Sequence, residues 1–148
     1  MFSKVVFLHF GKFKSKEHAL IFDDYINRLK HYIKVEVKEL KIERDDPEYF
    51  KRIQNKIDDA IKGTVILAFS ERGKLSTSFE FSNFIESGSG VLSVVVGSSW
   101  GLPDYVEKKA SCVLAIGRLT LPHEAVRVIA CEQLYRACTI IRNENYHK

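Results

Sequence analysis

Val91-Leu92-Ser93-Val94-Val95-Val96, followed directly by Gly97-Ser98-Ser99-Trp100-Gly101, is the stretch that decides the fold. An apolar run of this length predicts a strand that is buried on both faces of a parallel sheet. The glycines that flank the next few residues predict a tight turn after it. Ligand sites in open α/β sheets lie where such strands end. We therefore expect the chemistry of this chain to be concentrated beyond residue 90.

Apolar runs alternate with helical patterns along the whole chain. Strands are expected at 4–10, 35–42, 64–69, 91–96 and 112–116. Helices are expected at 15–32, 46–63, 103–110 and 122–141, with a further helix starting at a capping box formed by Thr77 and Glu80. This order predicts the α/β class, with a mostly parallel sheet, helices on both faces, and a single domain at 1–148. The polar stretch 43–46 is expected to be a disordered loop.

The composition is that of an ordinary globular protein, with 45% hydrophobic and 28% charged residues. The formal net charge of +4 permits a polyanionic partner without requiring one. No apolar run approaches the length of a membrane span, and the first residues read as a strand and not as a signal peptide. We therefore expect a cytoplasmic protein with no membrane partner.

The three cysteines, Cys112, Cys131 and Cys138, form no C-x-x-C pair. They are expected to be buried thiols in a reducing compartment. The five histidines show no spacing typical of metal ligands, so no metal site is expected.

The helix expected at 122–141 carries apolar residues around more of its circumference than one contact with a sheet needs. This pattern implies a second packing partner. The hypothesis that follows from it is a homodimer formed through this helix.

A G-x-S-x-G match occurs at Gly97, Ser99 and Gly101, between a strand and a helix. That is the context of a hydrolase nucleophile, so a small serine hydrolase is one alternative. The chain is short for that fold, and the early glycines that would form an oxyanion hole are missing. A glycine turn that lets backbone amides approach a small ligand is the favoured interpretation. No Rossmann or P-loop fingerprint is present.

Basic residues recur in the last third of the chain. Arg118 and Arg142 are placed to hold phosphates, whereas Arg136 follows Glu132 by four residues and could instead form a helical ion pair. The chain closes with Tyr146-His147-Lys148, which offers an aromatic ring, a titratable ring and a cation. A frayed tail is the ordinary alternative for such an end.

These segments together resemble one known family. The resemblance is carried by Val96-Gly97-Ser98-Ser99-Trp100-Gly101-Leu102, Leu119-Thr120-Leu121-Pro122-His123, Arg127, Glu132-Gln133-Leu134-Tyr135-Arg136-Ala137 and Tyr146-His147-Lys148. With them the chain resembles the bacterial ribosomal large-subunit pseudouridine methyltransferase H family, within the SPOUT class of trefoil-knotted methyltransferases. The resemblance covers nearly the whole length. It implies a homodimer with a C-terminal trefoil knot that binds S-adenosylmethionine.

The resemblance also implies a reaction and a set of site residues. The reaction is methyl transfer to N3 of a pseudouridine in 23S rRNA, on the assembled ribosome. The methyl donor would be held by Phe69, Gly97, Ile116, Gly117, Arg118, Leu119, Thr120 and Leu121. Tyr146 and His147 would be catalytic, and Arg136, Arg142 and Lys148 would bind RNA.

Three questions stay open at this point. Ser98 stands where the family usually has a second glycine, so a non-catalytic ribosome- or RNA-binding module is a further alternative. His147 could serve as a general base or only position the RNA. His123 could contact the donor or fix the start of the last helix, and the structural role is favoured.

Overall fold

The computed structural model describes residues 1–43 and 46–148, so Arg44 and Asp45 of the stretch expected to be a disordered loop lie outside the described residues. The described chain forms one five-stranded sheet in the order β2-β1-β4-β3-β5, with every pair parallel. The strands are β1 (Lys4–Phe10), β2 (Lys34–Leu40), β3 (Val65–Lys74), β4 (Val91–Val96) and β5 (Cys112–Leu114). The predicted class is confirmed.

Helices cover both faces of the sheet. They are α1 (Lys16–Leu29), α2 (Pro47–Arg52), α3 (Gln54–Ile61), α4 (Ser78–Ser87), α5 (Asp104–Lys109) and α6 (His123–Ile141). Successive residues of β4 point to opposite faces, so Val94 packs in the core shared with α1, α4 and α6, and Val95 packs in the core shared with α2, α3 and α5. Two apolar cores therefore sandwich the sheet, and this explains the continuous apolar runs of its central strands.

Helix starts follow the capping residues of the sequence. The Ser15 hydroxyl accepts the backbone N–H of His18 at 3.2 Å, before α1. At α4, Thr77 accepts the backbone N–H of Glu80 at 3.2 Å, and the Glu80 carboxylate accepts the N–H of Thr77 at 2.7 Å. Both caps satisfy backbone donors that a helix start leaves without intrahelical partners.

Two elements differ from the sequence prediction. The helix expected at 46–63 is two helices, α2 and α3, separated at Ile53, which has φ −97° and ψ 9°. The side chain of Ile53 is buried in the same core as Phe50 and Ile57, so the bend lets both helices reach that core. In addition, β3 continues to Lys74 beyond a register shift, because its far end pairs again with β5.

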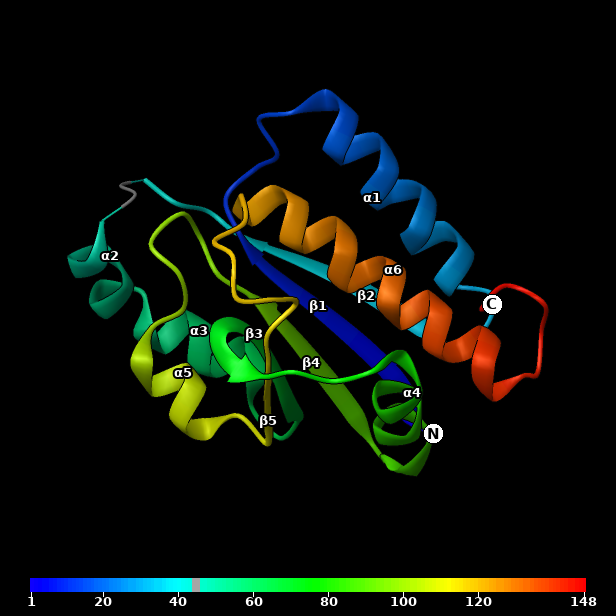
Figure 1. Ribbon diagram of the computed structural model, residues 1–148. Helices are drawn as coiled ribbons and strands as arrows, with labels where there is room; N and C mark the ends of the chain where they lie inside the picture. Colours follow the sequence, from blue (N-terminus) through cyan, green and yellow to red (C-terminus); the bar gives the residue numbers. More distant parts are fainter. Residues whose placement is uncertain (44–45) are drawn as a thin grey trace.

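The further packing partner expected for α6 is found within the chain, and the homodimer through this helix stays a prediction. α6 lies between α1 and α4 in one layer, as Figure 1 shows. Its apolar circumference is therefore covered on both flanks as well as by the sheet, and it does not by itself require a second subunit. Within residues 1–43 and 46–148, no helix is both long and apolar enough to cross a membrane. Cys112, Cys131 and Cys138 are buried free thiols, as expected.

The ends of β3 and β5 pack backbone against backbone. Ala115 donates its N–H to the carbonyl of Lys74 at 2.9 Å. A Cβ on Gly73 would lie 2.6 Å from the carbonyl carbon of Leu114, so only glycine permits this approach. The segment that follows β5 is thereby held across the end of β3. The trefoil knot implied by the resemblance stays a prediction.

Candidate donor and RNA site

A pocket of about 900 Å³ opens at the carboxyl ends of β3, β4 and β5. It is lined by seven of the eight residues expected to hold the methyl donor, namely Phe69, Gly97, Ile116, Gly117, Leu119, Thr120 and Leu121. This is the edge at which a parallel sheet presents its ligand sites. Pockets for single small molecules span ~300–1,000 Å³, so the volume of this pocket suits one small-molecule ligand.

The glycine turn forms one wall of the pocket and is internally braced. Ser98 and Gly101 exchange backbone hydrogen bonds of 3.2 and 2.9 Å. The Ser98 hydroxyl accepts the N–H of Trp100 at 3.1 Å. Gly101 has φ +79°, a conformation that other residues rarely adopt. Ser98 is buried, and its hydroxyl bonds within the turn. A serine at this position, where the family usually has a glycine, therefore stabilises the turn.

Gly97 sits where the turn leaves β4, and it has no room for a side chain. A Cβ there would lie 2.4 Å from the carbonyl carbon of Gly101. Gly117, on the facing loop, has open space beside it. The first glycine is therefore required by packing, and the second leaves room for a ligand close to the backbone.

The loop at 116–121 is tied to the end of β3. The guanidinium of Arg118 donates to the carbonyls of Glu71 and Gly73, both at 2.8 Å. The hydroxyl of Thr120 donates to the Glu71 carboxylate at 2.9 Å. These bonds fix the loop over the pocket. Both Arg118 bonds come from Nη1 of its exposed side chain, so its phosphate contact expected from the sequence stays a prediction.

A second tie closes the rim between β3 and α5. Arg72 donates to the carboxylate of Glu107 at 2.8 Å and lies 3.4 Å from that of Asp104. The hydrogen bond to Glu107 raises the pKa of Arg72. Sequence reasoning missed this pair and the Glu71 bond, because the partners are separated by more than thirty positions and no local motif links them.

Tyr146, the third residue from the end of the chain, packs against α6, so the tail is not frayed. Its hydroxyl donates to the Glu132 carboxylate at 3.0 Å and lies 3.3 Å from the hydroxyl of Tyr25. The ring meets Tyr135 edge-on at 4.8 Å, and the guanidinium of Arg136 covers it at 4.8 Å. Burial, followed by these hydrogen bonds, raises the pKa of Tyr146, so the phenol stays protonated near neutral pH.

The neighbouring His147 is held by Arg136 and Phe79. Nη1 of Arg136 lies 3.2 Å from Nδ1 of His147, and the Phe79 ring packs edge-on at 4.8 Å. Arginine can only donate, so Nδ1 accepts and the proton of a neutral ring sits on Nε2. Arg136 also binds Glu132 at 2.6 Å, and this bond is the main cause of its raised pKa. The helical pair weighed from the sequence is therefore present.

The tail and the pocket at the carboxyl ends of the strands are separated on one chain. Ten positions separate Val126, where α6 last lines the pocket, from Arg136 at the tail, which is ~15 Å along a helix at ~1.5 Å per residue. Figure 1 shows the C-terminus beside the far half of α6, away from the loop that precedes this helix. Arg142 and Lys148 are exposed at the same far end.

A buried cation fixes the start of α6 against β1. Arg127 donates to the carbonyls of Phe10 and, at 3.3 Å, Gly11, and its guanidinium lies 5.0 Å from the Phe13 ring centre. Nδ1 of the buried His9 lies 3.0 Å from the same Gly11 carbonyl. Burial, together with the charge of Arg127, lowers the pKa of His9 to about 4. These groups place the helix that borders the pocket.

Comparison with known proteins gives this geometry its context. A family model described as predicted SPOUT methyltransferase matches residues 3–147. The chain belongs to the SPOUT methyltransferase family. Relatives named ribosomal RNA large subunit methyltransferase H align with it over most of both lengths. The relative from Enterococcus faecalis is 34% identical over 98% of this SPOUT methyltransferase and 99% of its own chain. The relative from Trichlorobacter lovleyi is 36% identical over 84% of this protein and 86% of its own chain.

Solved structures agree in fold. A probable methylase family protein from Haemophilus influenzae superposes with a TM-score of 0.61 at 13% identity, covering 98% of this SPOUT methyltransferase and 70% of that chain. The SpoU methyltransferase AviRb from Streptomyces viridochromogenes, solved in complex with AdoMet, superposes with a TM-score of 0.50 at 11% identity. The superposition covers 96% of this protein and 61% of the AviRb chain. The fold expected from the sequence is therefore that of solved methyltransferases, and the protein is an enzyme of this class.

Proposed function

We propose that this SPOUT methyltransferase transfers the methyl group of S-adenosylmethionine to N3 of a pseudouridine in the 23S rRNA of the ribosome, in the cytoplasm. The observation that carries the proposal is the meeting of Phe69, Gly97 and the loop at 116–121 in one pocket. Relatives that cover most of the chain are named for ribosomal RNA large-subunit methylation, which supports the same substrate class.

The residues of the pocket suit the donor. Phe69, Leu119 and Leu121 offer apolar surface for an adenine ring, and the open side of Gly117 lets backbone groups reach a ligand. The Glu71 carboxylate at the same wall complements a positively charged donor. When bound, S-adenosylmethionine supplies a methyl carbon already activated by its sulfonium. The chain's part is to orient the donor and the acceptor, which can contribute ~7–11 kcal/mol toward the barrier.

The tail would act on the acceptor side. Tyr146 would stack on or bond to the extruded base, and Arg142, Lys148 and Arg136 would contact phosphates. Nδ1 of His147 accepts from Arg136, so a ring that keeps this contact offers a proton at Nε2 and no lone pair there. This supports a role for His147 in positioning the base over a role in removing its proton.

A homodimer would join the two halves of the site. On one chain the tail lies ~15 Å along α6 from the pocket. A second copy related by a twofold axis would bring its tail to this pocket. Exposed apolar side chains at Leu75, Phe79 and Leu119, the last 80% exposed, supply surface for such a contact. The trefoil knot is proposed with the same family architecture.

The deciding experiment supplies labelled S-adenosylmethionine to intact ribosomes from cells that lack this protein, with isolated subunits alongside. Label on a pseudouridine of 23S rRNA is the expected result. Donor binding is measured separately by calorimetry. Donor binding without label on any RNA would reject the proposed acceptor, and the absence of both would reject the methyltransferase assignment for this chain.

Neither alternative from the sequence is favoured. Ser99 lies at the tip of the turn closed by Ser98 and Gly101, and α5 begins only at Asp104, so the serine does not occupy the strand-to-helix elbow that a hydrolase requires. The alternative of a non-catalytic binding module was based on Ser98 in place of a glycine. The Ser98 hydroxyl accepts a hydrogen bond from the Trp100 N–H inside its own turn.

A further inference from the structure

The pocket has a second wall that the donor residues do not use. Phe50 and Lys51 of α2, Gln54 of α3 and Lys108 of α5 line this side. Trp100 stands at the mouth between the two walls and is 59% exposed. Because its turn is closed by backbone hydrogen bonds at Ser98 and Gly101, the indole is carried on a rigid support.

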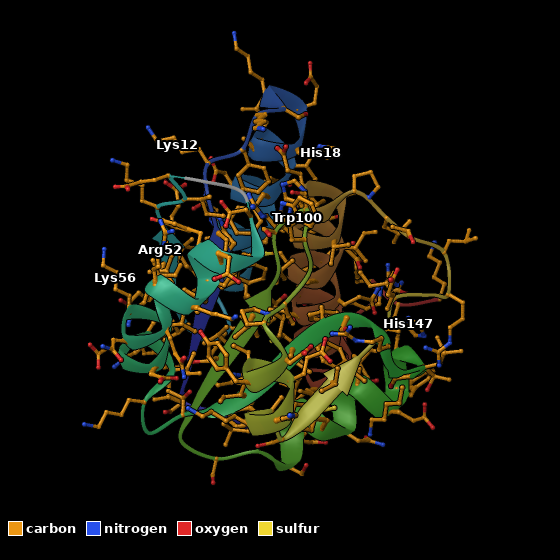
Figure 2. The ribbon with its side chains drawn as sticks, turned by 90° about the vertical axis from the view of Figure 1, so that its left-hand side faces the viewer. Lys12, His18, Arg52, Lys56, Trp100 and His147 are labelled. Atoms are coloured by element: carbon orange, nitrogen blue, oxygen red, sulfur yellow. The ribbon has the colours of Figure 1, made fainter. Side chains whose placement is uncertain are left out.

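Basic side chains continue outward from this wall. Figure 2 shows Lys12, Arg52 and Lys56 projecting from the same side of the molecule, with Trp100 beside them toward the middle of the view. All three are exposed, and over residues 1–43 and 46–148 none of them forms an ion pair.

Of the three carboxylates that α2 and α3 carry, two are already paired, and only the exposed Asp59 forms no ion pair within the described residues. Glu48 binds Lys51 at 3.2 Å, and Asp58 binds Lys109 at 2.9 Å. Such pairs weaken the negative potential that these acids would add to the surface. The available charge on this side is therefore positive.

An exposed aromatic ring beside a track of cations is the combination that binds single-stranded nucleic acid, through stacking and phosphate contacts. We propose that Trp100 stacks on a base next to the target nucleotide, and that Lys12, Arg52 and Lys56 hold the phosphates of the RNA strand that leads into the pocket. The inference rests on the proposed function for its substrate class. It adds an RNA-entry surface at the pocket mouth, distinct from the basic residues of the C-terminal tail.

The chain offers a direct probe, because Trp100 is its single tryptophan. A short oligouridylate is titrated against the protein with saturating S-adenosylhomocysteine, and indole fluorescence is recorded. We expect saturable quenching. Loss of stacking in Trp100→Ala should weaken oligouridylate binding about five- to hundredfold by anisotropy, whereas Trp100→Phe keeps most of it. Donor affinity is measured by calorimetry for all three proteins, because Trp100 also lines the pocket, and the loss of oligouridylate binding in Trp100→Ala should exceed any loss of donor binding.

The cations are tested together as Lys12→Glu, Arg52→Glu and Lys56→Glu in one variant. The matched control reverses Lys30, Lys34 and Lys62, which are exposed at the opposite edge of the sheet. We expect the first variant to bind oligouridylate with a smaller dependence on salt concentration, because each lost phosphate contact lowers the slope by ~0.7. The control variant should keep the slope of the wild type.

The outcomes separate the two proposals. Ribosome methylation by the wild type, with no quenching and equal salt slopes in both triple variants, would overturn the entry surface and leave the reaction standing. Quenching and a reduced slope without ribosome methylation would support the surface and reject the reaction. Normal oligouridylate binding by the first triple variant, with lost binding to intact ribosomes, would assign the cations to a ribosomal protein and overturn the inference.

Discussion

The guanidinium of Arg136 lies 3.2 Å from Nδ1 of His147 while it also binds Glu132 at 2.6 Å. One cation therefore joins the last turn of the chain to the middle of α6. The contact sets the tautomer of His147 and, with the Tyr146 bond to Glu132, gives the tail a defined position.

Deletion of 146–148 should abolish ribosome methylation, because it removes the ring, the imidazole and the cation assigned to the acceptor. Donor binding should change little, since the tail lines no part of the pocket. The protein should stay folded with a reduced free energy of unfolding, because the contacts of Tyr146 with Glu132 and Tyr135 are lost. Labelled methyl transfer and calorimetry measure the two effects. Deletion of Lys148 alone is the control, with a smaller expected loss. Full activity after removal of all three residues would show that the tail has no part in the reaction.

His147→Gln keeps a polar side chain but cannot titrate. We expect the single-turnover rate to fall about tenfold or less and its dependence on pH to keep the wild-type shape, because the ring positions the base. A general base usually contributes ~10²–10⁴-fold. A loss in that range, together with a flattened pH profile, would instead assign His147 as the base.

Gly97→Ala should cost about 1–3 kcal/mol of unfolding free energy and weaken donor binding, because the new Cβ meets the backbone of Gly101 at 2.4 Å. The matched substitution is Gly117→Ala, whose Cβ has open space and should leave the unfolding free energy nearly unchanged. Urea denaturation of both variants gives the comparison. Equal stability of the two would contradict the crowding at Gly97.

The stability of the protein should fall in acid through His9. Its folded pKa of about 4 lies below the value of ~6.5 in an unfolded chain, so the unfolded state binds the proton more readily. The contribution is complete above pH ~7 and is lost as pH falls from ~6.5 toward ~4, a change of about 3 kcal/mol.

His9→Gln removes this titration and should flatten the dependence of the unfolding free energy on pH over that window. Urea denaturation at several pH values measures the slope. His31→Gln, at an exposed histidine, serves as the control and should keep the wild-type slope. An unchanged slope in His9→Gln would show that His9 is not the titrating group.

The sequence by itself determined the alternation of strands and helices, apart from the break at Ile53, and the caps at Ser15 and Thr77, while the residues expected to hold the donor came from the family resemblance. It could do so because these features depend on local patterns, and because the carboxyl ends of parallel strands must meet at one edge. Phe69, Gly97 and the loop at 116–121 lie at or just after the apolar runs of neighbouring strands, so the meeting in one pocket of these residues, which the resemblance names, agrees with the predicted sheet.

Only the tertiary structure decided which side chains bond across that edge and between the tail and α6. Arg72 with Glu107, Thr120 with Glu71 and Tyr146 with Glu132 are pairs set by how the layers pack, and no periodicity encodes them. The same packing flanked α6 with α1 and α4, which a single helix pattern could not distinguish from a subunit contact. The apolar residues of a helix predict that its face is buried. They do not predict which element buries it, because the hydrophobic effect is non-directional and the packing of the whole chain decides the partner.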